Sequence, residues 1–356
     1  MEGRKLQKVG YSTFTISLPV EWIKQNGLKK GDVIVCNYEK DGSLKLMPIS
    51  MVRLKEESNH AVINMDLCES PKLLERVIVG CYIIGFQTIT VSSQNRIHGE
   101  WLSTIRNITF KLIGLSIMEE TPHKITLQCS IDPSSVSLVT MLRRLFILTT
   151  TMFMEVLEGL LNLNPTPIKE VINREYEADM LYWLILRIIM AAQNDHRIAE
   201  KAGVEDPRNL LGYRIVAKYL ESTADYLEIV AEHILRLIGL SKRLDESIIK
   251  DLHQMGGKAL GVYSDAFESL ITDDLKKANK SIEKKEKLED EGEKIICKVL
   301  GRSMKTEVAT HIACISRVFE RISDYGASIA HVTINRYVEK PSKMVFHREK
   351  TLTLGL

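Results

Sequence analysis

Residues 304–337 read MKTEVATHIACISRVFERISDYGASIAHVTINRY, and the apolar side chains of this stretch recur at every third or fourth position. That period is typical of an amphipathic helix, and it places Ile315 and Ile322 on one apolar face. Glu320 and Asp324 are four residues apart, so both lie beside that face. The stretch therefore predicts a long core helix that carries two neighbouring carboxylates.

The same period continues through the chain from Pro133 onward. It predicts six long helices, at residues 134–161, 166–194, 208–240, 245–271, 275–301 and 304–337. Long amphipathic helices with short connections pack antiparallel, either as one bundle or as two three-helix bundles.

Composition and charge exclude several classes of protein. The 356 residues are 45% hydrophobic and 26% charged, which is too apolar for a disordered chain. Lys and Arg total 48 against 46 acids, so a globally basic nucleic-acid coat protein is excluded, although a local basic patch is not. Six scattered cysteines indicate reduced thiols, and the stretch MEGRKLQKVG lacks the apolar core of a signal peptide. We therefore expect a soluble, cytoplasmic protein.

The first 132 residues have a different pattern. Residues 4–19 predict one or two strands, Pro19 opens a short helix, and Asp41-Gly42 indicates a hairpin. A unit this small buries little core, so it should dimerise or dock. A separate α/β piece follows, with strands expected at 61–65, 88–92 and 124–130 and helices at 71–84 and 99–112.

Four of the long helices carry two acidic residues spaced four apart. The pairs are Glu175/Asp179, Glu221/Asp225, Glu289/Glu293 and Glu320/Asp324. Like charges at this spacing destabilise a helix by about 0.2–0.5 kcal/mol, and partial burial increases the cost. A multivalent cation would remove the repulsion, because hard cations bind several carboxylate oxygens from facing helices. Chance yields roughly six such pairs in a chain this acidic, so the alternative is an acidic seam without an ion.

The pairs also repeat in order. They fall on the second and third helices of each half of the helical part. Glu289 follows Glu175 by 114 residues, and Glu320 follows Glu221 by 99. An insertion near residues 195–207 absorbs the difference, so the pattern predicts a twofold repeat of three-helix units.

The run Glu320-Arg321-Ile322-Ser323-Asp324, followed by the small residues Ala327 and Ala330, resembles the signature helix of PhoU phosphate-signalling proteins. The four acid pairs resemble that family's repeated E(D)-x-x-x-D motifs, which bind metal clusters on two three-helix bundles. The resemblance implies that all eight acids bind divalent or trivalent cations, namely iron, zinc, manganese or magnesium. The first repeat lacks the Arg of the motif, and Glu293 replaces the usual Asp. The first-repeat site is therefore expected to be weaker than the second-repeat site or to bind a different ion.

The N-terminal stretch RKLQKVGYSTFTISLPVEWIKQNGLKKGD, residues 4–32, is similar to the AbrB/SpoVT class of swapped-hairpin DNA-binding domains. Its Ser-Leu-Pro-x-x-Trp and Lys-Lys-Gly-Asp elements match the variant fused to PhoU domains, mainly in archaea. The resemblance implies a homodimer or higher oligomer. Residues 1–49 hold eight Lys or Arg against five acids. The expected DNA-contacting residues are Arg4, Lys5, Lys8 and Lys24. The alternative is a dimerisation domain whose lysines are merely solvated.

The fold class expected is mainly α, with two three-helix PhoU-type bundles preceded by a small β-rich swapped-hairpin domain and an α/β middle domain. The expected domains are 1–49 (swapped hairpin), 50–132 (α/β docking domain of unknown role), 133–240 and 241–338 (the two PhoU-like repeats), and 339–356 (a tail).

Two functions from different classes follow. The first is a regulator of phosphate uptake, in which a metal-binding helical sensor is fused to a DNA-binding dimer. The second is an adaptor without DNA binding that contacts the phosphate transporter or its sensor partners. A ferritin-like metalloenzyme is disfavoured, because none of the six predicted long helices contains a Glu-x-x-His pair. Since the chain also lacks a Gly-rich phosphate loop and a Gly-x-Ser-x-Gly motif, we do not expect an enzyme.

Overall fold

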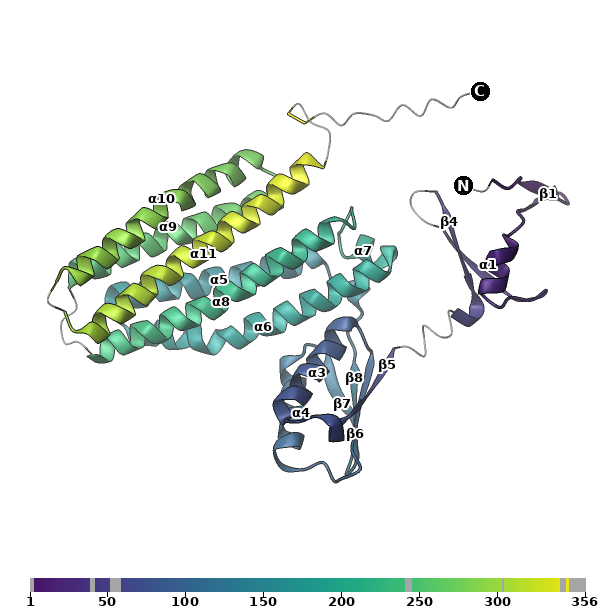
Figure 1. Cartoon of the computed structure of the whole chain (residues 1–356), viewed down its shortest axis with the longest axis horizontal. Coiled ribbons are helices and arrows are strands. Elements are labelled where there is room, and N and C mark those ends of the chain that lie inside the picture. The colour runs from purple at the N-terminus through teal and green to yellow at the C-terminus, as the bar shows by residue number, and fades with distance from the viewer. Residues whose placement is uncertain are drawn as a thin grey trace. The chain divides into compact units, whose positions relative to one another are not determined.

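The computed structural model describes residues 3–38, 42–51, 59–240, 245–302, 304–339 and 344–345. The chain forms two compact units, Met1–Val62 and Ile63–Leu356; their elements are labelled in Figure 1. The expected tail, residues 339–356, lies outside the described residues apart from Glu339, Met344 and Val345.

The described residues of the N-terminal unit include two small antiparallel pairs of strands and a short helix. They are β1 (Gln7–Val9) with β2 (Thr13–Thr15), α1 (Val20–Gln25), and β3 (Ile34–Tyr38) with β4 (Leu44–Pro48). These are the elements that the sequence predicts. Gly10 and Gly42 adopt positive φ angles of 70° and 80° in the two turns, a conformation that favours glycine.

This unit leaves most of its large apolar side chains exposed. They are Leu6, Val9, Tyr11, Phe14, Ile16, Val20, Val33, Tyr38, Leu44 and Met51. Helix α1 buries none of its residues. A single copy therefore has no core of its own among the described residues, and its apolar surface is of the kind that a partner chain covers.

The middle domain is a four-stranded sheet with two helices. Its elements are β5 (His60–Asn64), α3 (Pro71–Ile84), β6 (Thr88–Ser92), α4 (Gly99–Lys111), β7 (Leu115–Thr121) and β8 (Lys124–Cys129). The strand order is β5-β6-β8-β7, with β8 antiparallel to both neighbours. Strand β7 is the one element here that the sequence does not predict. It is an edge strand that exposes five of its seven residues, so its apolar alternation is weak.

The helical part contains the six predicted long helices and one short one. They are α5 (Leu138–Asn162), α6 (Pro165–Asn194), α8 (Asn209–Leu240), α9 (Glu246–Thr272), α10 (Leu275–Leu300) and α11 (Thr306–Val338). The short helix α7 (His196–Lys201) occupies the predicted insertion. Side chains of Ser137, Asn164 and Asp245 cap the N-termini of α5, α6 and α9.

Helices α5, α6 and α8 pack as one three-helix unit, and α9, α10 and α11 pack as a second (Figure 1). The two three-helix groups share one hydrophobic core. In it the rings of Phe153 on α5 and Phe319 on α11 stack with their centroids 5.6 Å apart. Gly326 allows α11 to approach α9, because a Cβ there would lie 3.0 Å from Cα of Tyr263. The two expected packing arrangements are thus combined, as two three-helix units around one core.

Helix α5 is the one described helix that is long and apolar enough to cross a membrane. Its Leu142, Phe153 and Leu160 are fully buried in the shared core. A core helix of a soluble protein has this character, so the composition of α5 is explained by its packing.

The middle domain packs against α6, and two side chains of α6 stand out in this contact. Trp183 packs against the core of the middle domain. Arg187 is only 1% exposed, and its guanidinium donates hydrogen bonds to the backbone carbonyls of Tyr82 (2.5 Å), Phe86 (3.1 Å) and Gly85 (3.3 Å). These carbonyls form the C-terminal end of α3, where a helix presents unpaired acceptors and the negative end of its dipole. A buried positive charge is therefore matched by another domain.

Candidate metal centre

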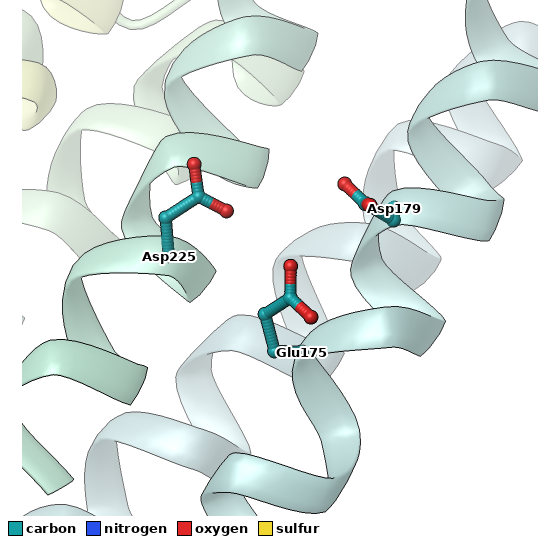
Figure 2. A group of neighbouring side chains, drawn as sticks. All are labelled: Glu175, Asp179 and Asp225. Atoms are coloured by element: carbon teal, nitrogen blue, oxygen red, sulfur yellow. The ribbon is translucent and has the colours of Figure 1, made fainter. Parts of the chain in front are cut away.

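Three carboxylates from two helices meet in the first repeat. Glu175 and Asp179 lie on α6 and Asp225 lies on α8, and one oxygen of each is within 4.8 Å of the others. Figure 2 shows the three side chains directed into the space between the two helices. The four-residue spacing places Glu175 and Asp179 on one face of α6, as predicted. Across the described part of the chain, no other group of three or more Asp, Glu, His or Cys residues comes this close together.

Burial and neighbouring acidic side chains raise the pKa of all three groups. The pKa of Asp179 rises from 3.8 to about 7, first because of burial and then because of Glu175, Glu221 and Asp225. That of Asp225 rises to about 6, through burial and Glu221. That of Glu175 is raised mainly by burial, with Glu228 the largest contribution from a neighbouring charge. The cluster thus concentrates negative charge that a cation would neutralise.

Glu221 borders this cluster without joining the group of three. Its side chain is 9% exposed, and its Oε2 accepts hydrogen bonds from Lys218 Nζ (2.6 Å) and Ser222 Oγ (3.1 Å). The structure therefore brings three of the four predicted first-repeat acids together and pairs the fourth with a lysine.

The second repeat has a different arrangement. Lys285 on α10 forms ion pairs with Glu289 and with Asp324, the latter at 3.1 Å. Arg317 pairs with Glu320 at 2.8 Å, and the side chain of Glu293 is exposed. The four predicted acids of this repeat are thus interleaved with basic side chains.

Glu320 lies against a glycine of the facing helix. One of its oxygens, Oε1, is buried without a hydrogen-bond partner. A Cβ at Gly292 on α10 would collide with this oxygen. The absence of a side chain at Gly292 therefore makes room for the Glu320 carboxylate.

Sequence reasoning did not identify the lysines beside these carboxylates. The spacing of Lys218 to Glu221 and of Lys285 to Glu289 was available as a signal, because residues three or four apart on a helix are neighbours. The contact between Lys285 and Asp324 joins two helices and leaves no such local signal.

The four predicted DNA-contacting residues all lie in the N-terminal unit, and their side chains are exposed. Lys8 is in β1 and Lys24 is in the last turn of α1, whereas Arg4 and Lys5 precede β1.

The raised carboxylate pKa values predict a pH-dependent stability for metal-free protein. A carboxyl group whose pKa is raised by folding binds its proton more tightly in the folded chain than in the unfolded one. Its contribution to stability is therefore lost as pH rises from about 4 to about 7, with Asp179 dominating the upper part of that range. We expect the melting temperature of metal-free protein to fall over this interval, and to fall less in Asp179→Asn. Asp290→Asn, an exposed acid on α10, is the matched control; an equal effect there would contradict the assignment.

Comparisons with known proteins bear on both units. The PhoU domain model matches residues 142–234 and 252–333, and the model described as "Antidote-toxin recognition MazE, bacterial antitoxin" matches residues 7–54. No curated protein matches the chain. The expected tandem repeat and small N-terminal domain thus correspond to two separate family matches.

Two solved structures are similar in fold. PhoU from Pseudomonas aeruginosa is 14% identical, with a TM-score of 0.50 over 55% of this chain and 93% of that one. The phosphate transport system regulatory protein PhoU from Streptococcus pneumoniae is 19% identical, with a TM-score of 0.49 over 57% and 94%.

Proposed function

Because the helical part of this chain belongs to the PhoU domain family, we propose that the protein is a cytoplasmic regulator of phosphate uptake. In this proposal a metal-binding helical sensor is joined to a DNA-binding dimerisation domain. The observation that carries it is the cluster of Glu175, Asp179 and Asp225, which offers a site for a cation. The basic N-terminal unit, whose apolar side chains are largely exposed, supports the part of the proposal that concerns DNA and dimerisation. The protein acts as a regulator and not as an enzyme.

The proposed metal ligands are the carboxylates of Glu175, Asp179 and Asp225, with Glu221 beside them. All the donors are oxygen atoms, a set that suits hard cations such as magnesium, manganese and iron better than zinc. The cation would supply positive charge where burial and repulsion raise the pKa of these acids. Metal analysis of protein purified without added metal tests this part of the proposal.

The proposed partners of the N-terminal unit are a second copy of the chain and DNA. The exposed apolar side chains of the two strand pairs support dimerisation, because a shared barrel would cover them. The exposed Arg4, Lys5, Lys8 and Lys24 support contact with DNA phosphates. The helical part would contact the phosphate transporter or phosphate-signalling proteins.

The second candidate is an adaptor whose N-terminal unit binds a protein instead of DNA. The match of residues 7–54 to a family named for the recognition of a toxin favours it. The exposed apolar side chains of this unit would then form the protein-binding surface.

Salt-dependent DNA binding separates the two candidates. Replacing Arg4, Lys5 and Lys8 with Ala removes three candidate phosphate contacts per chain. Each lost contact should lower the slope of log K against log salt by about 0.9 on B-DNA. The measurement is fluorescence anisotropy with DNA from upstream of phosphate-transport genes, at several salt concentrations.

The matched control replaces three exposed lysines of the helical part, Lys169, Lys276 and Lys280, with Ala. It removes the same charge and should leave the slope as in the wild type. If the N-terminal variant also keeps the wild-type slope, the basic residues do not contact DNA and the adaptor is favoured.

A further inference from the structure

The two repeats can be compared residue by residue. A shift of 99 residues relates α8 to α11, and it aligns Lys218 with Arg317. Each of these basic residues pairs with the glutamate three positions later, Lys218 with Glu221 at 2.6 Å and Arg317 with Glu320 at 2.8 Å. The shift that aligns the acid pairs of α8 and α11 therefore also aligns the basic residue that pairs with the first acid of each.

One position differs in kind between the repeats. The shift of 114 residues that relates α6 to α10 aligns Lys285 with Val171. Val171 is fully buried in the apolar core, so nothing positive from that position reaches the first cluster. The side chain of Lys285 is 21% exposed, and its ammonium pairs with a carboxylate of its own helix and with one of α11.

A lysine ammonium between carboxylates of two helices does what a bound cation would do there. It supplies positive charge and donates hydrogen bonds to oxygens that would otherwise repel one another. A metal ion entering the second repeat would have to displace it and then meet Arg317 and Arg321 as well, both of which pair with acids of this site. Among the described residues, Glu175, Asp179 and Asp225 form no ion pair, whereas Lys218 pairs with the neighbouring Glu221.

We propose that Lys285 takes the place of a cation in the second repeat, so that the chain binds its metal at the first repeat alone. This inference rests on the proposed function, because it requires a metal site at Glu175, Asp179 and Asp225. It reverses the order of strength that the sequence motif implies. The two repeats then neutralise their carboxylates in different ways. The first repeat uses a metal cation, and the second uses the ammonium group of Lys285.

The test measures Mn²⁺ binding to the full chain, stripped with EDTA and dialysed, by isothermal titration calorimetry and equilibrium dialysis. Glu175→Gln/Asp179→Asn should weaken binding by roughly 10–100-fold or more, since it removes ligands. Glu289→Gln/Asp324→Asn should bind as the wild type does.

Lys285→Val should gain Mn²⁺ beyond the wild-type stoichiometry, and Lys285→Met, which keeps most of the stem, serves as a second version of that variant. Lys280→Val, an exposed lysine on the same helix, is the control and should gain none.

Each outcome decides between the two proposals. Loss of Mn²⁺ from Glu289→Gln/Asp324→Asn, with retention in Glu175→Gln/Asp179→Asn, overturns the inference and leaves the protein a metal binder. Unchanged stoichiometry in both folded Lys285 variants also overturns it. If the wild type binds no Mn²⁺ but Lys285→Val does, the proposed first-repeat site is wrong while the blocking role of Lys285 stands. Absence of binding in every variant overturns both.

Discussion

Chelation of protein purified with its metal should lower the melting temperature by about 5–10 °C. A ligand present at about 100 times its dissociation constant stabilises the folded state by about 2.7 kcal/mol, and a domain of this size shifts by roughly 2–4 °C per kcal/mol. Removing the ion also restores the repulsion between Glu175, Asp179 and Asp225. Differential scanning fluorimetry with and without EDTA measures the shift.

Two variants make this measurement specific to the first repeat. Glu175→Gln/Asp179→Asn has lost the charge that a cation would neutralise, so its melting temperature should not respond to EDTA. Glu320→Gln/Asp324→Asn should still respond to EDTA, because it leaves the proposed first-repeat metal site intact. The second repeat, which it changes, holds Lys285 in place of a metal ion. A wild-type protein that contains no metal and ignores the chelator would leave the cluster as a hydrated acidic seam.

Replacing Arg187 with Met should destabilise the folded chain by roughly 2–4 kcal/mol, because one buried and two partly buried carbonyls lose a charged donor. Methionine keeps much of the apolar stem, so the loss reports the hydrogen bonds more than the packing. Urea denaturation followed by circular dichroism measures it. Hydrogen exchange should also quicken at the C-terminal end of α3, where the donor is lost.

Arg144→Met is the matched control, since Arg144 is an exposed arginine on α5. It should change stability by less than about 0.5 kcal/mol. Arg187→Lys should fall between the two, because an ammonium cannot reproduce the fork of a guanidinium. An Arg187→Met protein as stable as Arg144→Met would show that the middle domain is held by apolar packing alone.

The helices of this chain could be predicted from the sequence because each has a sustained apolar period. Strand β7 could not, since its exposed half reads Glu-Glu-Thr and an edge strand needs little apolar alternation. Helix spacing likewise revealed every acid pair, because the two members of a pair are neighbours on one helix. Which pairs come together depends on contacts between helices, such as Lys285 with Asp324, and the spacing along one helix does not contain them.

The role of Arg187 could not be predicted for the same reason. The backbone carbonyls that accept its hydrogen bonds lie 101 to 105 residues away in the chain. A buried arginine in the middle of an apolar run also has no local partner to suggest its role. The apolar period predicted a helix over residues 166–194, in which Ile185 and Ile189 are buried, but it could not show that the charge between them is matched by another domain.

The docking of Arg187 also bears on how such a chain could be assembled in evolution. The sequence pattern changes near residue 132, where the middle domain ends and the helical part begins. A helical part without the middle domain would expose the ring of Trp183 and the guanidinium of Arg187 to water on the side of α6. A middle domain joined to a different helical part would in turn lose the donor that Arg187 supplies to the C-terminal end of α3. Exchange of either part is therefore expected to cost apolar burial at Trp183 or hydrogen bonds at α3.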